Sequence, residues 1–551
     1  MRFNRRSFLA AASLASASLA AAPIPAYARG LSAGAFTHGV ASGDPLPDRV
    51  MLWTRFVHSN EGRIGWEVSE SEDFAAPVAR GETQARFADD FCVKIDARGL
   101  RPGRRYFYRF LAGSGPSPTG LTRTAPESGV ESLNIALFSC SNFPYGYFHA
   151  YGHAAARADI DIAVHVGDYI YEMGRGTYPS EAEAVPGRII DPARELVSLS
   201  DYYQRYATYH SDPDLLELRR VKPLCAVWDD HELVNDTWRE GAKDHNPDYE
   251  GAFSARMAAA TKAYFDWMPL RRPDPRAPRL YRALDWGDLA RIVLLDTRLI
   301  GRDRQVAPPR ELFFARQINS FQVEFHRELY AAERSMLGAA QEAWLSETLA
   351  GSKARGQTWQ VLAQQVVMGE QIAPDTLTNF LPPGLHPNAR RWYEAGEALG
   401  RLGLPWNYDS WGGYPAARQR LLDACVAHAA NALVLAGDSH NCWINNHPGE
   451  GRMAAIEFAG GSVTSPGFER ALSNAGPGER EAAMRGANPN IAWCDLTRRG
   501  YGGLRLTRGA CEAEWIAFDS VREPHAPPAR ITRFTAQSSA AAGPSGWSIS
   551  G

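Results

Sequence analysis

The sequence lacks three features that would each indicate a class of protein. Its 59 Lys and Arg residues nearly balance its 62 Asp and Glu residues, which argues against nucleic acid or an anionic membrane surface as a partner. Beyond the N-terminus no segment approaches the length of a transmembrane helix. The 7 cysteines are scattered without a CxxC pair, so neither a zinc knuckle nor a dense disulfide framework is indicated. Their odd number leaves at least one free thiol unless two chains are cross-linked.

The N-terminus has the pattern of an export signal. Two arginines in "NRRSFLA" precede a short stretch rich in alanine and serine, and "AYA" at residues 26–28 offers a small-x-small cleavage site. A membrane anchor is the weaker alternative because the apolar run is short. We therefore predict a twin-arginine signal peptide over residues 1–28, export by the twin-arginine machinery, and a periplasmic or secreted protein. This route carries folded proteins, commonly with a cofactor already inserted, and so favours a metalloenzyme.

The region after the signal has the rhythm of short β-strands. Residues 49–56 and 63–69 alternate apolar and polar side chains as half-buried strands do. In "LRPGRRYFYRF", Tyr106 begins a run of alternating aromatics, and the arrangement resembles the tyrosine corner of immunoglobulin-like and fibronectin-type sandwiches. We predict a small β-sandwich domain over residues 29–127.

A longer region of alternating strands and helices follows. Residues 335–350 have helical periodicity, and the alternation predicts an α/β body with buried strands. We assign residues 128–537 to this body and residues 538–551 to a flexible C-terminal tail. The predicted strands lie in "LNIALFSC", "DIAVHVGD", "LCAVWDDHE", "ARIVLLDTR", "TWQVLAQQV", "NALVLAGDSH" and "AAIEFAGGS".

Polar and chargeable side chains follow these strands, at the point where each strand ends. The crevice beyond the carboxyl ends of strands is where α/β sheets bind ligands, so residues far apart in sequence become candidates for one site. Carboxylates, a thiol, a phenol, an amide and an imidazole suit bound cations better than a nucleophilic triad. The candidates are Cys140, Asp168, Tyr171, Asp229, Asp230, His231, Glu232, Asn235, Asp438 and His440.

Each motif also has a less specific interpretation. A GD dipeptide such as Gly167–Asp168 is common in turns and caps, and "WDDHELVND" is also compatible with a solvated loop that caps a helix. Cys140 at the end of "IALFSC" is compatible with a buried hydrophobe, a disulfide partner or a metal ligand. The polar "SN" directly after it fits poorly with a purely hydrophobic role.

Taken together, these segments resemble the metallophosphoesterases, and specifically the PhoD-type alkaline phosphatase/phosphodiesterase family. The resemblance covers nearly the whole chain after the signal and implies a metallophosphoesterase-like α/β fold with central β-sheets flanked by helices, preceded by the small β-sandwich. Several long motifs occur in family order, which makes chance agreement remote. The motifs are "GVASGDPLPDRVMLWTR", "SCSN", "GDYIYE", "WDDHELVND", "LDTR", "LGAAQEAWL", "GDSHN" and "EFAGGSVTSPG".

The resemblance implies a site that holds Fe(3+) and Ca(2+) and cleaves phosphate monoesters and diesters. Asp168 would bridge the two ions. The iron ligands carried over to this chain are Cys140, Asp168, Tyr171 and His440. The calcium shell would be completed by the oxygens of Asn235 and Asp438. These choices agree with the preference of calcium for hard oxygen ligands and of transition metals for thiolate and imidazole.

The implied reaction is hydrolysis by a metal-bound hydroxide. His231 and Asp230 are assigned to catalysis, with His231 as the donor of a proton to the leaving alkoxide. An equally weighted alternative is that His231 orients Asn235. Arg298 in "LDTR" is expected to pair with a nearby acid rather than to bind phosphate.

Rival functions and two departures from the family pattern remain open. The rivals are a phosphatase with a serine nucleophile in "GDSH", a phospholipase-type diesterase acting on lipid head groups, and a non-catalytic exported protein that binds a surface glycan. Residues 409–414 ("DSWGGY") lack the second acid of the expected Asp-x-Trp-Asp-Gly-Tyr element. Asn441 and Cys442 stand where small hydroxyl residues would be usual. Neither departure removes a predicted ligand.

Overall fold

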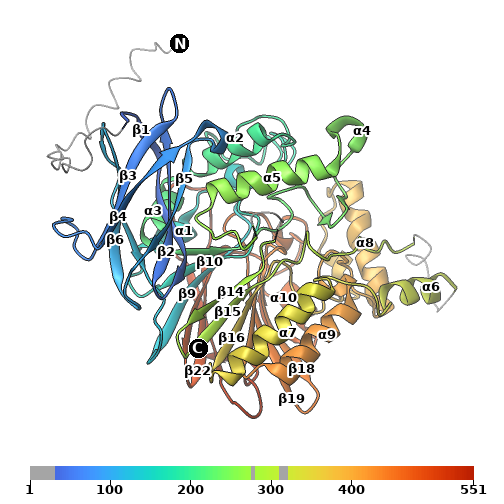
Figure 1. Cartoon of the computed structure of the whole chain (residues 1–551). Helices are drawn as coiled ribbons and strands as arrows, with labels where there is room; N and C mark the ends of the chain where they lie inside the picture. Colours follow the sequence, from blue (N-terminus) through green and yellow to red (C-terminus); the bar gives the residue numbers. More distant parts are fainter. Residues whose placement is uncertain (1–31, 275–278, 310–319, 551) are drawn as a thin grey trace, which may run out of the picture.

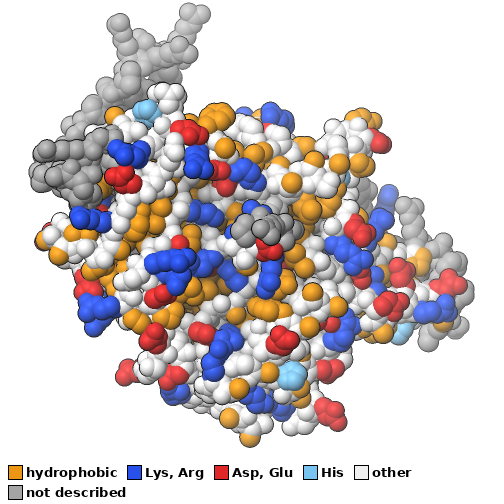
Figure 2. All heavy atoms as spheres, in the orientation of Figure 1, with side chains coloured by type: hydrophobic (Ala, Val, Ile, Leu, Met, Phe, Trp, Pro, Cys, Tyr) orange, Lys and Arg blue, Asp and Glu red, His pale blue; other side chains and the backbone are white. Residues whose placement is uncertain are grey.

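The computed structural model describes residues 32–274, 279–309 and 320–550. The predicted signal peptide lies outside these residues. Among the described helices, none is long and apolar enough to cross a membrane. On the face shown in Figure 2, basic and acidic side chains are interspersed, in keeping with the nearly balanced charge of the sequence.

The N-terminal region is a β-sandwich, as predicted. One layer holds β1 (Ala35–Leu46), β2 (Arg49–Val57) and β5 (Cys92–Arg98). The other holds β4 (Ala79–Ala85), β3 (Gly62–Ser69), β6 (Arg105–Ala112), β7 (Gly115–Pro116) and β8 (Gly120–Arg123). The predicted tyrosine corner is present, because the Tyr106 hydroxyl accepts a hydrogen bond from the Arg101 N–H at 2.8 Å.

The sandwich and the body share a sheet. Gly43 of β1 pairs in parallel with Leu224 of β11 (Leu224–Ala226), so β1, β2 and β5 continue a ten-stranded sheet. In the part of the chain that the structure describes, its other strands are β9 (Ser132–Phe138), β10 (Ile162–His165), β21 (Arg499–Thr507), β22 (Ala510–Phe518), β23 (Arg530–Gln537) and β24 (Ser548–Ser550).

A second, seven-stranded sheet packs against the first. Its strands run in the order β14 (Arg282–Trp286), β15 (Ala290–Leu294), β16 (Trp359–Ala363), β17 (Ala432–Ala436), β19 (Arg452–Gly460), β18 (Cys442–Gly449) and β20 (Ile491–Asp495). Strand alternation gives this sheet two buried faces. Ile292 and Leu294 join the core between the sheets, whereas Val293 and Leu295 join the core under the outer helices.

Helices cover the outer faces of both sheets (Figure 1). α7 (Ala339–Ala354) and α9 (Pro415–His428) pack on the second sheet, and α7 corresponds to the helix predicted over residues 335–350. α1 (His149–Ala156), α2 (Leu199–Tyr209), α3 (Pro213–Val221) and α5 (Phe253–Trp267) lie on the side of the first sheet and the sandwich. In the described residues the remaining α-helices are α4 (Pro247–Glu250), α6 (Ser320–Leu329), α8 (Pro387–Arg401) and α10 (Glu479–Ala487).

The C-terminal segment differs from the predicted flexible tail. Residues 548–550 form β24, which pairs with β23. The Trp547 side chain is only 8% exposed, and its Nε1–H donates to the Glu457 carbonyl at 3.1 Å. Burial of this one large aromatic side chain anchors a segment whose composition of Ala, Gly, Ser and Pro is otherwise typical of a loose tail.

Candidate functional site

The carboxyl ends of parallel strands from both sheets meet at one place. Cys140 follows β9, Asp168 follows β10, and Asp438 follows β17. Two glycines allow the turns to approach closely. A Cβ at Gly167 would lie 2.3 Å from the Asp229 Cβ, and a Cβ at Gly437 would lie 2.5 Å from the Ser139 Cβ. The glycine of each GD motif therefore permits neighbouring strand ends to touch.

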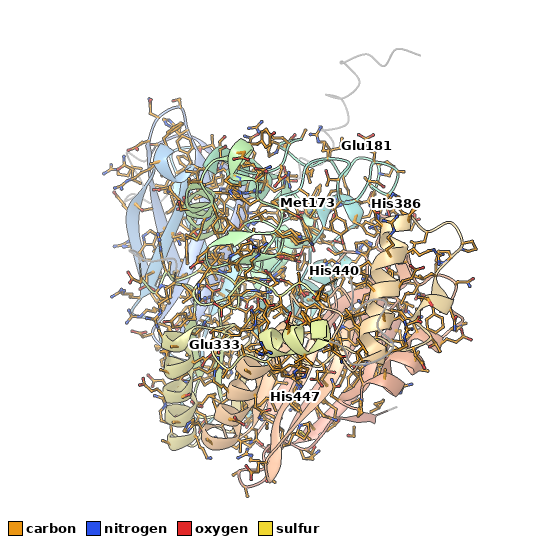
Figure 3. The ribbon with its side chains drawn as sticks, turned by 90° about the vertical axis from the view of Figure 1, so that its right-hand side faces the viewer. Met173, Glu181, Glu333, His386, His440 and His447 are labelled. Carbon is orange, nitrogen blue, oxygen red and sulfur yellow. The ribbon has the colours of Figure 1, made fainter. Side chains whose placement is uncertain are left out.

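One group of side chains brings a thiol, a carboxylate and an imidazole together. Ligand atoms of Cys140, Asp168 and His440 lie within 4.8 Å of one another. The Tyr171 hydroxyl donates to Asp168 Oδ2 at 3.0 Å and lies 3.2 Å from His440 Nε2. His440 Nδ1 is 2.9 Å from the Pro466 carbonyl, so it carries the proton and leaves Nε2 as an acceptor toward the group. His440 lies near the middle of Figure 3, between the segment that carries Met173 and the helix that begins after His386.

The electrostatics of this group fit a bound cation. Burial raises the pKa of the Asp168 carboxyl to about 7, although the nearby His231 opposes the shift. Asp168 Oδ1 is buried without a hydrogen-bond partner. Burial, with the charge of Asp168, raises the pKa of the Cys140 thiol well above its usual value. Burial lowers the pKa of His440 to about 3, which keeps the imidazole neutral as a metal ligand must be. A cation would satisfy the orphaned oxygen and stabilise the thiolate.

Four candidate residues adopt left-handed backbone conformations that non-glycine residues rarely take. The φ angles are 60° at Cys140, 55° at Asp168, 63° at Asp438 and 61° at His440. Such conformations cost about 1–3 kcal/mol each and persist only where the surroundings enforce them. Part of the enforcement is visible, because the Cys140 N–H donates to the Gly167 carbonyl and the Ser141 N–H donates to the Asp168 carbonyl. Strain concentrated in this way is typical of functional sites.

His231 lies beside this group and is held by a buried carboxylate. Its Nδ1 is 2.7 Å from Glu172 Oε2, and its ring packs on Tyr171 with centroids 4.3 Å apart. Ligand atoms of His231, Asp168 and Asp230 lie within 4.8 Å of one another. Burial alone lowers the pKa of His231, but the negative charges of Glu172, Asp168 and Asp230 outweigh it and raise the pKa well above its usual value.

Asn235 is placed differently from the other candidates. Its backbone N–H donates to Glu172 Oε1 at 2.7 Å, and its Nδ2 donates to Asp244 at 2.8 Å. Glu172 therefore bridges His231 and Asn235. The link connects the two residues through a carboxylate, whereas the Asn235 amide is directed toward Asp244.

Arg298 occupies the centre of a second group of carboxylates. Its side chain is fully buried and pairs with Asp229, with Asp409 at 2.7 Å and with Asp438 at 3.2 Å. The expectation that Arg298 pairs with acids agrees with these contacts. Acid oxygens in this group lie close enough to share a cation, in the sets Asp229, Asp230, Asp438 and Asp230, Asp236, Asp409.

The sequence did not predict the contacts that three carboxylates make in the site. Glu172 is the last residue of "GDYIYE", and its position in that motif is the signal that could have found it. Glu232 accepts backbone N–H bonds from Asp168 at 3.0 Å, Tyr169 at 2.7 Å and Asp229 at 2.8 Å, and so fastens the turns after β10 and β11 together. Asp409, the first acid of "DSWGGY", joins the group around Arg298.

The remaining motif positions have structural partners. Ser439 is the candidate nucleophile of the serine-phosphatase hypothesis. Its hydroxyl accepts a hydrogen bond from Trp443 Nε1 at 2.7 Å and is therefore engaged in a structural contact. Asn441 Oδ1 accepts from the Phe468 N–H at 3.2 Å. Gly412 stands where the family pattern has its second acid, and a Cβ there would lie 3.0 Å from the Pro405 Cβ. The local packing leaves little room for a larger side chain at this position.

Comparisons with known proteins give consistent results over most of the chain. A family model described as PhoD-like phosphatase matches residues 135–515, and a model described as the N-terminal domain of PhoD-like phosphatase matches residues 20–126. Alkaline phosphatase D of Bacillus subtilis (strain 168) is 33% identical over 521 residues, a match that covers 90% of this chain and 79% of the relative. A solved structure of PhoD superposes with a TM-score of 0.75 at 29% identity, covering 94% of this chain and 92% of that one.

Proposed function

The chain belongs to the PhoD-like phosphatase family, and from this premise we propose that it hydrolyses phosphate monoesters and diesters at an iron–calcium site formed by the strand ends. The observation that carries the proposal is the meeting of a thiol, a carboxylate with an orphaned oxygen and a neutral imidazole in one buried group. This donor set suits a transition metal, and the adjacent carboxylates suit calcium.

Under this proposal Cys140, Asp168, Tyr171 and His440 would hold iron, and Asp168 would also offer an oxygen to calcium. Asp438 contributes an oxygen to the calcium shell. The role of Asn235 rests on the family resemblance: its Nδ2 donates to Asp244, and Oδ1 is the atom that would bind calcium. Asp230 has a buried Oδ1 without a hydrogen-bond partner and lies within reach of Asp168 and Asp438, so it supplies a further oxygen.

The chain's own residues divide the remaining chemistry. When bound, the cations acidify water and neutralise the negative charge of the phosphoryl oxygens. Glu172 holds His231 through Nδ1, which leaves Nε2 as the atom that gives a proton to the leaving alkoxide. The ring of Tyr171 fixes the plane of His231 from one side. Burial of these groups excludes bulk water from the proton transfer.

Metal analysis of the exported, folded protein tests the proposal together with assays on p-nitrophenyl phosphate and bis(p-nitrophenyl) phosphate. Iron is expected in the purified protein, and chelation is expected to abolish turnover of both esters until calcium is restored. Abundant zinc without iron, or unchanged turnover after chelation, would overturn it. Export belongs to the same proposal: replacing Arg5 and Arg6 by Lys should retain the protein in the cytoplasm.

A further inference from the structure

A cavity of about 650 Å³ opens beside the carboxylates around Arg298. One wall is a single face of α8, which presents Trp392, Ala395, Gly396 and Leu399 at the i, i+3, i+4 and i+7 positions. The lining also includes Trp238 of the short hairpin β12 (Thr237–Trp238) and β13 (Gly241–Ala242). The volume of the cavity lies within the range of about 300–1,000 Å³ that is typical of small-molecule sites.

Aromatic side chains line this cavity from several elements. Trp392 is 48% exposed and packs on Trp406, with ring centroids 5.2 Å apart. A Cβ at Gly396 would lie 2.6 Å from a ring atom of Trp406, so the glycine in the middle of α8 permits this packing. Glycine inside a helix costs about 1 kcal/mol relative to alanine, and here it positions an aromatic wall. Tyr408 adds a further ring to the lining.

Cationic side chains stand among the aromatic ones. The Arg304 guanidinium lies over the Trp238 ring at 5.2 Å. Lys243 also lines the cavity and pairs with Asp236 at 2.9 Å. The lining also holds the carboxylates Asp236 and Asp409, so it combines flat apolar faces with charged groups of both signs, which suits a polar ring system better than an alkyl chain.

The cavity borders carboxylates that adjoin the proposed catalytic groups. Asp236 and Asp409 belong to its lining, and their oxygens lie within 4.8 Å of an oxygen of Asp230. Asp230 in turn lies within the same distance of Asp168 and His231. Asp230 therefore links the carboxylates of the cavity lining to the proposed proton donor and to the cation group.

We infer that this cavity binds the planar ring of the leaving group in a phosphate ester, and that nucleoside monophosphates are a preferred substrate class. The inference rests on the proposed function, since it places the phosphate at the cation group. The base would lie against Trp392 and Trp238, and its ribose would bridge to His231. Stacking on aromatic side chains is indifferent to base identity, so we expect little discrimination among nucleobases.

Adenosine 5′-monophosphate and ribose 5-phosphate form a matched pair for the test, because both release a primary alcohol and only the first carries a base. The wild-type protein should favour the nucleotide in kcat/KM by about tenfold or more, the size expected for one stacked base. Trp392→Ala, at a half-exposed position, and Ala395→Phe, which fills the cavity from the same helix face, should each bring this ratio close to one. Phe87→Ala, at an exposed aromatic of the sandwich, is the matched control and should leave the ratio unchanged.

Adenosine binding gives a readout that does not need turnover. Adenosine should quench tryptophan fluorescence in the wild-type protein, less so in Trp392→Ala, and ribose should not quench it in either. Equal kcat/KM for the two esters in the wild-type protein would refute the inference while leaving the proposed function intact, since ribose 5-phosphate is still hydrolysed. The inference would also be refuted if both esters were preferred over glycerol 1-phosphate but adenosine 5′-monophosphate were not preferred over ribose 5-phosphate. That result would mean that the cavity binds the sugar and not the base. Hydrolysis of none of the three would count against the proposed function itself.

Discussion

Replacing Arg298 by Met removes the positive charge at the centre of the acidic group while keeping a long apolar side chain. Arg298 is fully buried and pairs with Asp229, Asp409 and Asp438. Breaking a buried ion pair by removing one partner costs about 3–5 kcal/mol, because the other charge is left buried and uncompensated. Four carboxylates share this guanidinium, because Asp230 also lies 3.7 Å from it, so the free energy of unfolding should fall by at least the lower figure at neutral pH.

The loss should grow as the pH rises. Burial raises the pKa of Asp229 and of Asp438, and the charge of Arg298 opposes the shift in both. Without Arg298 the folded-state pKa of each acid rises further above the unfolded value of about 3.9. The folded state then binds more protons than the unfolded state, so stability declines with increasing pH across the interval between the two values. Urea unfolding midpoints at pH 5 and pH 8 should separate the variant from the wild type more widely at pH 8.

Calcium should partly replace the missing charge. A cation that binds only the folded state raises the free energy of unfolding. At concentrations above its dissociation constant, the gain grows with the logarithm of the cation concentration. The variant should therefore have its lowest unfolding midpoint when a chelator is present. Millimolar calcium should raise that midpoint more than it raises the midpoint of the wild type. Unfolding is followed by tryptophan fluorescence, for which the chain has 15 Trp residues.

Arg282→Met provides the matched control. Arg282 is buried and pairs with Asp44 at 2.7 Å, away from the acidic group around Arg298. Its loss should destabilise the protein without a special response to calcium. An Arg298→Met variant as stable as the wild type would contradict this role of Arg298, as would a variant destabilised to the same degree at both pH values and with or without calcium.

Three further substitutions separate ligands from the proposed acid. Cys140→Ser should fold and be exported yet lose much of its iron, its visible charge-transfer absorption and its activity; full iron and full turnover would exclude the thiol as a ligand. Asp168→Ala should abolish metal binding and activity together, as measured by metal analysis and ester hydrolysis, and a variant that keeps both ions would contradict the bridging role. His231→Ala should retain the metals and lose about 10²–10⁴-fold in rate. That loss should be larger for esters with poor leaving groups, and equal losses would count against His231 as the acid.

The strand-end residues could be predicted because their signals are local. Each apolar strand is followed at once by a polar motif, and parallel strands must bring their carboxyl ends to one edge. Cys140, Asp168 and His440 are brought together as this reasoning expects. The tyrosine corner at Tyr106 was likewise predictable, since a short motif defines both its residue and its backbone partner.

Contacts between distant segments could not be predicted from local patterns. Glu232 accepts hydrogen bonds from backbone N–H groups of two turns. A backbone partner of this kind leaves no pattern in the side chains from which it could be predicted. The cavity lining combines α8 with a hairpin far away in sequence. β24 escaped prediction for a similar reason, since a single buried Trp547 anchors it. Asn235 stands in the expected motif, yet the hydrogen bond from its Nδ2 to Asp244 could not be predicted from that motif.

Backbone strain and buried negative charge at the site both lower the stability of the metal-free protein. Cys140, Asp168, Asp438 and His440 hold costly left-handed conformations, and burial raises the pKa of the Asp168 and Asp438 carboxyls. Both features destabilise the metal-free protein, and cations at the proposed site would relieve the electrostatic part. Under the proposed assignment, metal binding therefore contributes directly to folding. Because the twin-arginine route carries folded proteins, loading the metals before export would add their stabilisation to the exported form, which links the predicted twin-arginine leader to the chemistry of the site.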